Sequence, residues 1–334
     1  MNIYDIADMA GVSIATVSRV VNGSSKVSEK TRQKVLDVIE KSGYTPNVFA
    51  QGLGLNTMHT IGILVPQISD LYMANAVSYL EQRLHKLGYN CILSCSGFLA
   101  NQKDAHVQML LSKRIDALIL VGSTYAGSED QTHNSDYIKR AALEVPVFLI
   151  NGVVEGENVY CTASNDYQAT FDATRFLIEN GHRRIIFMTD SRSYSANQKK
   201  RGYEDALSYM GIELGKEMEV FIKNDVEDAK RQFSKFDNLK YDAVLSTDDA
   251  MAIGAMKYLI SQNRNIPEDV SIIGYNNSSL CVCTTPELTS IDNMVERVAE
   301  ETVSRLESVL NGDTNVSQKN IVACNLVKRG TTEG

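Results

Sequence analysis

The chain has 334 residues, 43% of them hydrophobic, and a formal net charge of −8. A chain of this length can bury a sizeable core and predicts two or three domains. The net negative charge argues against a protein that coats nucleic acid non-specifically, yet residues 1–59 carry six Lys/Arg against five Asp/Glu, a local balance of +1. The sequence shows neither an export signal nor an apolar stretch long enough to span a bilayer, which predicts a cytoplasmic location without membrane contact.

Sequence motifs of metal binding and catalysis are missing. The six Cys residues occur in no paired zinc or redox spacing, and the five His residues form no ligand-spaced cluster. Consecutive Asp248 and Asp249 at the start of a predicted helix suit a cap and a helix-dipole partner better than a catalytic dyad. We therefore predict a protein that is not an enzyme and that needs no cofactor or metal.

The N-terminal segment predicts two short helices joined by a tight turn. Apolar residues between positions 3 and 21 fall at helical spacing on two segments, and Gly11-Val12-Ser13 separates them. Gly11 fits the positive φ at which a helix ends, Val12 would fill the angle between the helices, and Ser13 would cap the second helix.

A third helix and a conditional linker helix follow. Ser28 offers a cap for a helix over residues 29–42, and Pro46 then breaks the pattern. Residues 47–55 predict a short helix of marginal stability, because Gly52 and Gly54 each cost about 1 kcal/mol relative to Ala.

After the linker the pattern changes to short β-rich runs that alternate with amphipathic helices, which predicts repeated βαβ units with parallel sheets. The strands are predicted at residues 61–65, 90–95, 116–121, 147–150, 184–188, 242–246 and 270–274. Helices are predicted at 74–87, 168–180 and 250–262, and Gly88, Gly181 and Gly211 fit glycine caps at helix ends.

The two N-terminal helices fit a helix-turn-helix, in which the second helix enters the major groove of DNA by its N-terminal residues. On that geometry Ile14, Ala15, Ser18 and Arg19 face the bases, and Arg19 suits guanine or phosphate. The full set of predicted DNA-binding residues is Ile3, Tyr4, Ser13, Ile14, Ala15, Thr16, Ser18, Arg19, Asn22, Lys26, Asn47 and Leu53. The alternative is a generic helical hairpin whose polar residues are only solvated.

The runs IYDIADMAGVSIATVSRVVNG, VSEKTRQKV, GYTPN, FAQGL and, near the C-terminus, LVKRGTT together resemble the LacI/GalR bacterial transcription regulators. The resemblance implies a head at residues 1–46, a hinge helix and linker at 47–59, and an effector-binding and dimerisation core at 60–334. It also implies a homodimer on a pseudo-palindromic operator, with Leu53 as a wedge in the minor groove. Because the chain stops before the leucine heptad of tetrameric members, a dimer is expected, with contacts through the helix at 74–87.

The regulatory part is similar to periplasmic sugar-binding proteins of the type I fold, which have two doubly wound lobes with the ligand between them. Ligands sit beyond the carboxyl ends of parallel strands, and this rule selects Ser69, Tyr72, Asn151, Asp248 and Asn276. The resemblance adds Lys199, in the place of the family's usual sugar-binding arginine, and Asn276 stands where an aspartate is usual. With these departures, an acidic or phosphorylated ligand is one alternative to a neutral sugar. Met73 beside Tyr72 argues against a nucleobase as the ligand.

The sequence therefore predicts an N-terminal all-α helix-turn-helix head followed by an α/β core of the periplasmic-binding-protein type I fold. The sequence predicts a DNA-binding transcriptional regulator that acts as a repressor. Its affinity for the operator is predicted to be controlled by a small effector, a sugar or sugar derivative. One alternative is control by a phosphorylated protein corepressor, as in the catabolite control proteins, although the helix at 74–87 lacks the basic cluster that a phosphoserine requires. The other alternative is a solute-binding protein without a regulatory role.

Overall fold

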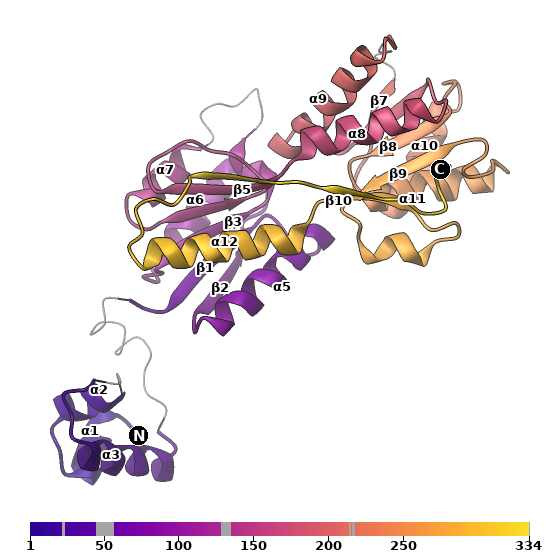
Figure 1. The fold of residues 1–334 in the computed structure, drawn as a ribbon. Coiled ribbons are helices and arrows are strands. Elements are labelled where there is room, and N and C mark those ends of the chain that lie inside the picture. The colour runs from indigo at the N-terminus through magenta and orange to yellow at the C-terminus, as the bar shows by residue number, and fades with distance from the viewer. Residues whose placement is uncertain (22–23, 45–56, 128–134, 214, 216–217, 334) are drawn as a thin grey trace.

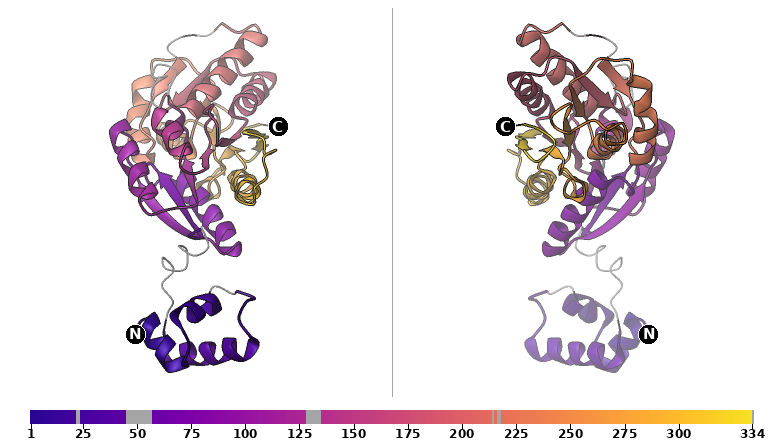
Figure 2. Two further views of the ribbon diagram at one scale, coloured as in Figure 1. Left: turned by 90° about the vertical axis from the view of Figure 1, so that its left-hand side faces the viewer. Right: turned by 90° about the vertical axis from the view of Figure 1, so that its right-hand side faces the viewer.

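The computed structural model describes the chain except residues 22–23, 45–56, 128–134, 214, 216–217 and 334. A small helical head stands apart from a two-lobed α/β core (Figures 1 and 2). The head comprises α1 (Ile3–Ala10), α2 (Ile14–Val21) and α3 (Glu29–Ser42). The predicted hinge helix at 47–55 lies wholly outside the described residues, and the predicted domain boundaries stay a prediction.

The turn between α1 and α2 has the geometry that the sequence predicts. Gly11 adopts a left-handed conformation at φ 59°, and Val12 packs into the apolar core of the head. The Ser13 hydroxyl accepts a hydrogen bond from the backbone N–H of Thr16 at 3.2 Å, which caps α2. At the start of α1, Asn2 and Asp5 form a capping box.

The first lobe of the core, the N-lobe, is built on a wholly parallel six-stranded sheet in the order β11-β5-β4-β3-β1-β2. Its strands are β1 (Thr60–Val65), β2 (Asn90–Cys95), β3 (Ala117–Val121), β4 (Val147–Ile150), β5 (Val159–Ser164) and β11 (Lys319–Val322). Its helices are α5 (Leu71–Lys86), α6 (Ala100–Leu111), η1 (Ser123–Ala126), α7 (Asp136–Ala142) and α12 (Val295–Leu310). Apolar side chains fill both faces, with α5 and α12 side by side on one face and α6 and α7 on the other (Figure 1).

The second lobe, the C-lobe, has a sheet in the order β12-β10-β9-β8-β6-β7, parallel except for the antiparallel pairing of β12 with β10. Its strands are β6 (Ile185–Thr189), β7 (Glu219–Phe221), β8 (Ala243–Ser246), β9 (Ser271–Tyr275), β10 (Thr289–Asp292) and β12 (Asn325–Val327). Its helices are α8 (Asp166–Glu179), α9 (Tyr194–Tyr209), α10 (Val226–Phe233), η3 (Ser234–Phe236), α11 (Asp249–Ser261) and η4 (Ser279–Cys283).

The chain passes between the lobes at three places: from β5 to α8, from β10 to α12, and from β11 to β12 (Figure 1). A hydrogen bond joins the first two crossing segments: the Ser164 hydroxyl at the end of β5 donates to the Asn293 carbonyl, just after β10, at 2.7 Å. These segments hold the lobes together beside the cleft, so any change in the angle between the lobes must bend them.

The predicted fold class is confirmed, and the predicted strands appear within one residue of their expected bounds. The three predicted core helices begin earlier than expected, at Leu71, Asp166 and Asp249. In each case a side chain just ahead caps the helix, from Asp70, Asn165 or Asp248. The three expected cap glycines, Gly88, Gly181 and Gly211, all have positive φ. Among the described helices, none combines the length and apolar character that a membrane span requires.

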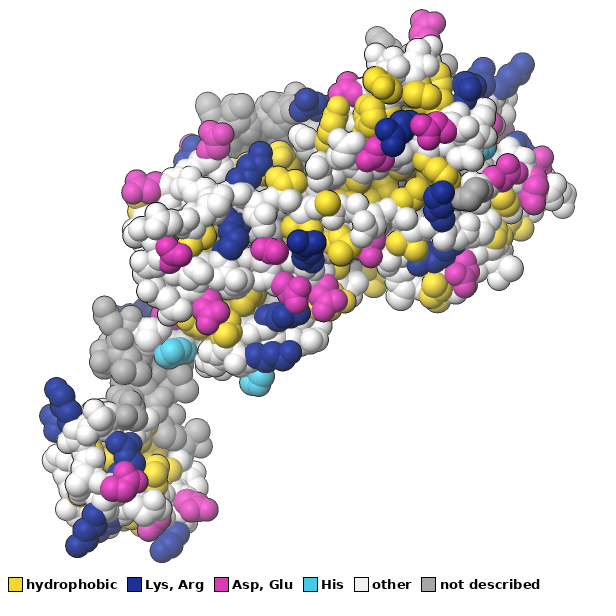
Figure 3. Space-filling view, in the orientation of Figure 1, with side chains coloured by type: hydrophobic (Ala, Val, Ile, Leu, Met, Phe, Trp, Pro, Cys, Tyr) yellow, Lys and Arg dark blue, Asp and Glu magenta, His cyan; other side chains and the backbone are white. Residues whose placement is uncertain are grey.

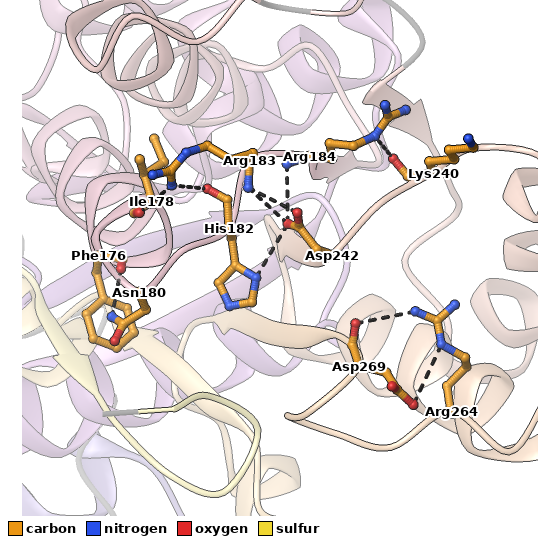
Figure 4. Close-up of polar contacts among 10 residues, drawn as sticks. All are labelled: Phe176, Ile178, Asn180, His182, Arg183, Arg184, Lys240, Asp242, Arg264 and Asp269. Atoms are coloured by element: carbon orange, nitrogen blue, oxygen red, sulfur yellow. Dashed lines mark hydrogen bonds and ion pairs between the residues drawn. The ribbon is translucent and has the colours of Figure 1, made fainter.

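Asp242 fixes the start of β6 against β8 at the end of the C-lobe sheet away from the cleft. Figure 4 shows its carboxylate facing the backbone of Arg183 and Arg184, whose N–H groups donate to it at 3.1–3.2 Å. The His182 ring lies 3.4 Å away. Burial alone would raise the pKa of Asp242, but the His182 ring and the two backbone N–H groups outweigh it and lower that pKa.

We expect Asp242→Asn to lower the stability of the protein at pH 7 by roughly 1 kcal/mol, because charge-assisted hydrogen bonds are weakened. Since the folded protein lowers the pKa of Asp242, its contribution is present above the unfolded value of about 3.9 and is lost as pH falls below it. Differential scanning calorimetry should therefore show a lower Tm for Asp242→Asn than for wild type at pH 7, and this difference in Tm should become smaller below pH 4. An equal gap at both pH values would contradict this role.

Candidate functional site

The head presents one exposed face of α2. Val17 and Val20 are buried against α1 and α3, whereas Ile14, Ala15 and Arg19 are exposed. Ile14, Ala15, Ser18 and Arg19 fall at helical spacing on the outer side, as i, i+1, i+4 and i+5. The helix thus offers its N-terminal turn and an arginine to a partner outside the head.

The other predicted DNA-binding residues surround this face where the structure describes them. Tyr4 is 63% exposed, Lys26 is exposed, and Ser13 and Thr16 join their hydroxyls at 2.9 Å beside the turn. Ile3 instead packs partly into the core of the head. Asn22, Asn47 and Leu53 lie outside the described residues. Figure 3 shows Lys and Arg side chains spread over the head.

A cavity of about 450 Å³ lies between the lobes. The strand-end rule and the family resemblance select six residues for effector binding, and the structure brings all six to the lining of this cavity: Ser69, Tyr72, Asn151, Lys199, Asp248 and Asn276. Five of them meet because they follow the carboxyl ends of β1, β4, β8 and β9, and these ends of the two sheets border the cavity. Lys199 reaches the cavity from α9. Two further cavities of about 330 Å³ each lie on the C-lobe alone.

Two of these residues leave their strands by a turn that asparagine tolerates. Asn151 and Asn276 directly follow β4 and β9, and their φ values are 63° and 96°. Asn is enriched at positive φ among non-glycine residues. The backbone turns sharply at these points and places the side chains on the cavity wall.

Asn276 holds Asp248 in the wall. Its amide nitrogen donates to Asp248 Oδ2 at 2.8 Å, and its amide oxygen accepts from Asn293 Nδ2 at 2.7 Å. The other oxygen of Asp248 caps α11 through the Ala250 N–H at 2.8 Å. An aspartate at position 276 would set two carboxylates against each other, which explains the amide found here in place of the usual acid.

Lys199 is turned into the wall of the C-lobe. It is 7% exposed, its Nζ donates to the Thr247 carbonyl at 3.1 Å, and Nζ lies 3.5 Å from the ring centroid of Tyr275. The Tyr275 hydroxyl in turn donates to Asp166 Oδ1 at 2.6 Å, and Ser195 Oγ donates to Asp166 Oδ2 at 2.5 Å. Because Asp166 begins α8 just after the β5 crossing, this chain of contacts links the cavity to a segment between the lobes.

Unpartnered polar atoms gather around the cavity. Among the described residues, five lining side chains have a buried polar atom without a hydrogen-bond partner: Tyr72 OH, Thr124 Oγ1, Asn151 Oδ1, Asn224 Oδ1 and Thr247 Oγ1. The described lining of the two other cavities contributes none. Buried polar groups cost free energy unless they are paired, so this wall is suited to a polar ligand.

Sequence reasoning missed several lining residues. Asp190 directly follows β6, and the strand-end rule would have found it. Asn224 and Asp225 follow β7, whose three residues are too short for a recognisable alternation. Across the cavity, Ser123 Oγ of the N-lobe donates to Ser193 Oγ of the C-lobe at 2.9 Å, a contact between segments that no sequence pattern connects.

The buried position of Asp248 generates a prediction about pH. Burial raises its pKa to about 7, and the charges of Asp249 and Asp70 add to the rise. Between pH 4 and pH 7 the folded protein therefore keeps a proton that the unfolded chain has released, so the free energy of unfolding falls as pH rises through this window.

Asp248→Asn removes this titration. We expect the Tm of the variant relative to wild type to increase between pH 5 and pH 8, by the equivalent of at least about 1 kcal/mol, since one pKa unit corresponds to about 1.4 kcal/mol. Differential scanning fluorimetry across this range provides the measurement, with exposed Glu144→Gln as the control. A Tm difference that does not change with pH would show that Asp248 has an ordinary pKa.

Comparison with known proteins covers both parts of the chain. Residues 2–47 match the family described as bacterial regulatory proteins, lacI family, and residues 174–332 match a periplasmic binding protein-like domain. An HTH-type transcriptional regulator of Lachnoclostridium phytofermentans is 48% identical over 334 residues, 99% of each chain. Catabolite control protein A of Priestia megaterium is 32% identical over 94% of each chain.

The core and head together also match a solved structure. The crystal structure of the Lac repressor dimer bound to operator and the anti-inducer ONPF aligns with a TM-score of 0.90 at 25% identity, covering 100% of this chain and 99% of that one. With the head, the two lobes and the full-length relatives in agreement, the chain belongs to the LacI family of DNA-binding transcriptional regulators, a family of regulators rather than enzymes.

Proposed function

We propose that this regulator represses transcription as a homodimer on a pseudo-palindromic operator, and that a small carbohydrate-like effector in the cleft between the lobes controls its operator affinity. The observation that carries the effector proposal is the convergence of unpartnered polar atoms on the interlobe cavity. The exposed face of α2 supports the operator proposal.

Base readout is assigned to the exposed face of α2, with Ile14 and Ala15 in its first turn and Arg19 in its last. Arg19 is exposed and able to pair bidentately with guanine, while Ile14 and Ala15 suit the methyl group of thymine. Tyr4, Ser13, Thr16 and Lys26 carry donors that suit phosphate oxygens. Asn22, Asn47 and the minor-groove wedge Leu53 complete the proposed interface, although the structure does not describe them.

A second copy of the chain would cover the exposed apolar residues around β2. This strand forms one edge of the N-lobe sheet, and Leu93 on it is 43% exposed. Phe98, just after β2, Ile68, just before α5, and Leu71, at the start of α5, are likewise exposed. An unpaired edge with large apolar side chains is the kind of surface that proteins normally cover. The Lac repressor in the matching crystal structure is a dimer.

We propose a two-state switch for the control of DNA binding. An effector that contacts both lobes favours one angle between them. This angle can affect the head because β1 of the N-lobe directly follows the segment that leads to the head. Allostery requires only that the effector bind the two states with different affinity, and a coupling of roughly 1–3 kcal/mol suffices. The marginal helix predicted at 47–55 is the element that this coupling would bias.

A phosphorylated protein corepressor is a weaker candidate. The α5 helix is expected to be its docking surface, yet Arg83 there already pairs with Glu300 and lies 3.8 Å from Glu296 of α12. A phosphoserine would meet these carboxylates and would have to compete for the arginine. The views in Figure 2 show α5 and α12 along one side of the N-lobe.

Arg19→Ala tests the head. We expect a loss of about 10–100-fold in affinity for an operator selected from random duplexes by the wild-type protein, because a bidentate base contact contributes roughly 1–3 kcal/mol. Fluorescence anisotropy gives the affinity, and Lys30→Ala on α3 is a control with the same loss of charge. Equal losses in the two variants would mean that Arg19 contributes only its charge.

Thr247→Val tests the cleft. The substitution replaces an unpartnered hydroxyl by a methyl group, so the ligand-free protein should keep or slightly increase its Tm while the affinity for an effector falls by about tenfold. A thermal-shift screen against sugars identifies the effector, because a ligand that binds the folded state raises Tm.

Thr170→Val is the matched control, because the Thr170 hydroxyl is also buried and unpartnered but does not line the cavity. Its affinity for the effector should equal that of wild type. Effector control would be contradicted by a screen in which no small molecule changes either the Tm or the operator affinity of the wild-type protein.

A further inference from the structure

The interlobe cavity has an excess of negative charge. Four carboxylates line it, on both lobes: Asp70, Asp190, Asp225 and Asp248. Among the described lining residues, Lys199 is the one cation, so the formal balance is −3 when all are ionised. Acidic residues are common in sites that bind sugar hydroxyls, but an unbalanced set favours a ligand that brings positive charge.

Lys199 offsets part of this charge, and it does so from the wall of the C-lobe. Its ammonium donates to the Thr247 carbonyl and lies against the face of the Tyr275 ring, and 7% of the residue is exposed. A cation over an aromatic ring is stabilised by the ring itself. The positive charge is therefore already engaged by the wall of the C-lobe.

Asp70 of the N-lobe and Asp190 and Asp248 of the C-lobe line the same cavity. Desolvation at the cleft wall raises the pKa of Asp190, Lys199 lowers it, and the charge of Asp70 from the opposite lobe adds a smaller rise. The same Asp70 charge raises the pKa of Asp248. In both cases Lys199 opposes the effect without cancelling it. Negative charge from the two lobes thus meets across the cavity.

The unpartnered atoms are an independent sign of a ligand. Thr247 is 6% exposed and its hydroxyl has no partner. Asn151 on the N-lobe and Asn224 on the C-lobe each leave an amide oxygen, an acceptor, unpaired. An ammonium group has three donors and no acceptor, so it suits a wall that offers amide oxygens and carboxylates as acceptors.

We propose that the effector is a hydroxylated primary amine, of the chemical class of an amino sugar, whose ammonium group lies between Asp70 of the N-lobe and Asp190 of the C-lobe. The proposal rests on the proposed effector control and specifies the class of its ligand. A cation between the lobes attracts both of them, so its binding closes the cleft. A phosphorylated or acidic ligand is disfavoured, because it would add negative charge to a site that already holds an excess.

The first experiment compares matched sugars on the full-length protein by thermal shift and by operator anisotropy. The probes are glucosamine and the β-1,4-linked glucosamine disaccharide, their N-acetylated forms, glucose, cellobiose and glucose 6-phosphate. We expect at least one of the two amines to raise Tm and change operator affinity, and its N-acetylation to reduce the effect at least tenfold in concentration.

The outcomes separate the two proposals. A neutral or phosphorylated sugar that acts at least as well as its amine would overturn the amine assignment and leave effector control standing. No effect from any probe would overturn the amine assignment, and effector control then depends on the broader screen.

A second experiment does not require the effector to be known. Asp190→Asn keeps the shape of the side chain and removes one of the mutually repelling charges, so we expect the Tm of the ligand-free protein at pH 7.5 to rise by about 1 °C or more. The exposed control Glu144→Gln should leave Tm unchanged. A Tm in Asp190→Asn that is equal to or lower than that of wild type would exclude the proposed role of Asp190.

Discussion

The contact between the Lys199 ammonium and the face of Tyr275 is the interaction on which the arrangement of the cleft depends. It holds the one described cation of the lining against the wall of the C-lobe, and it extends through the Tyr275 hydroxyl to Asp166 at the start of α8. An arginine in this position would spread its charge over a larger planar group with five donors. The lysine is compact enough to sit over one ring and donate to the Thr247 carbonyl, which leaves the carboxylates to determine the charge of the site.

Asn276 has the complementary role. Because its amide donates to Asp248 and accepts from Asn293, it joins the end of β9 to the start of α11 and to the segment that crosses toward α12. Both departures from the usual family pattern therefore have a local physical reason, and both involve partners that a sequence does not reveal. Lys199 is forty-eight residues from Thr247, and Asn276 is twenty-eight residues from Asp248.

Much of the fold could be predicted because local patterns of residue types determine its strands and turns. The β-rich runs became strands, and Gly11, Val12 and Ser13 form the turn that their residue types favour. The short polar strands β5 and β10 were missed because VYCTAS and TSID carry buried hydroxyls where an apolar run would be expected. The strand-end rule placed its candidates around one cavity because it follows from topology. The net charge of that cavity also depends on Asp70 and Asp225, which cap α5 and α10 and which the sequence analysis did not select.

The hydrogen bond between Ser123 and Ser193 has a consequence for the rate at which the regulator can respond. This pair joins the two lobes across the cavity in the absence of ligand, and a neutral hydrogen bond of this kind contributes only about 1 kcal/mol. Thermal motion breaks a contact of this strength readily, so it does not by itself keep the cleft closed. Under the effector control proposed above, this hydrogen bond would therefore add little to the barrier that a ligand meets on entering the cleft.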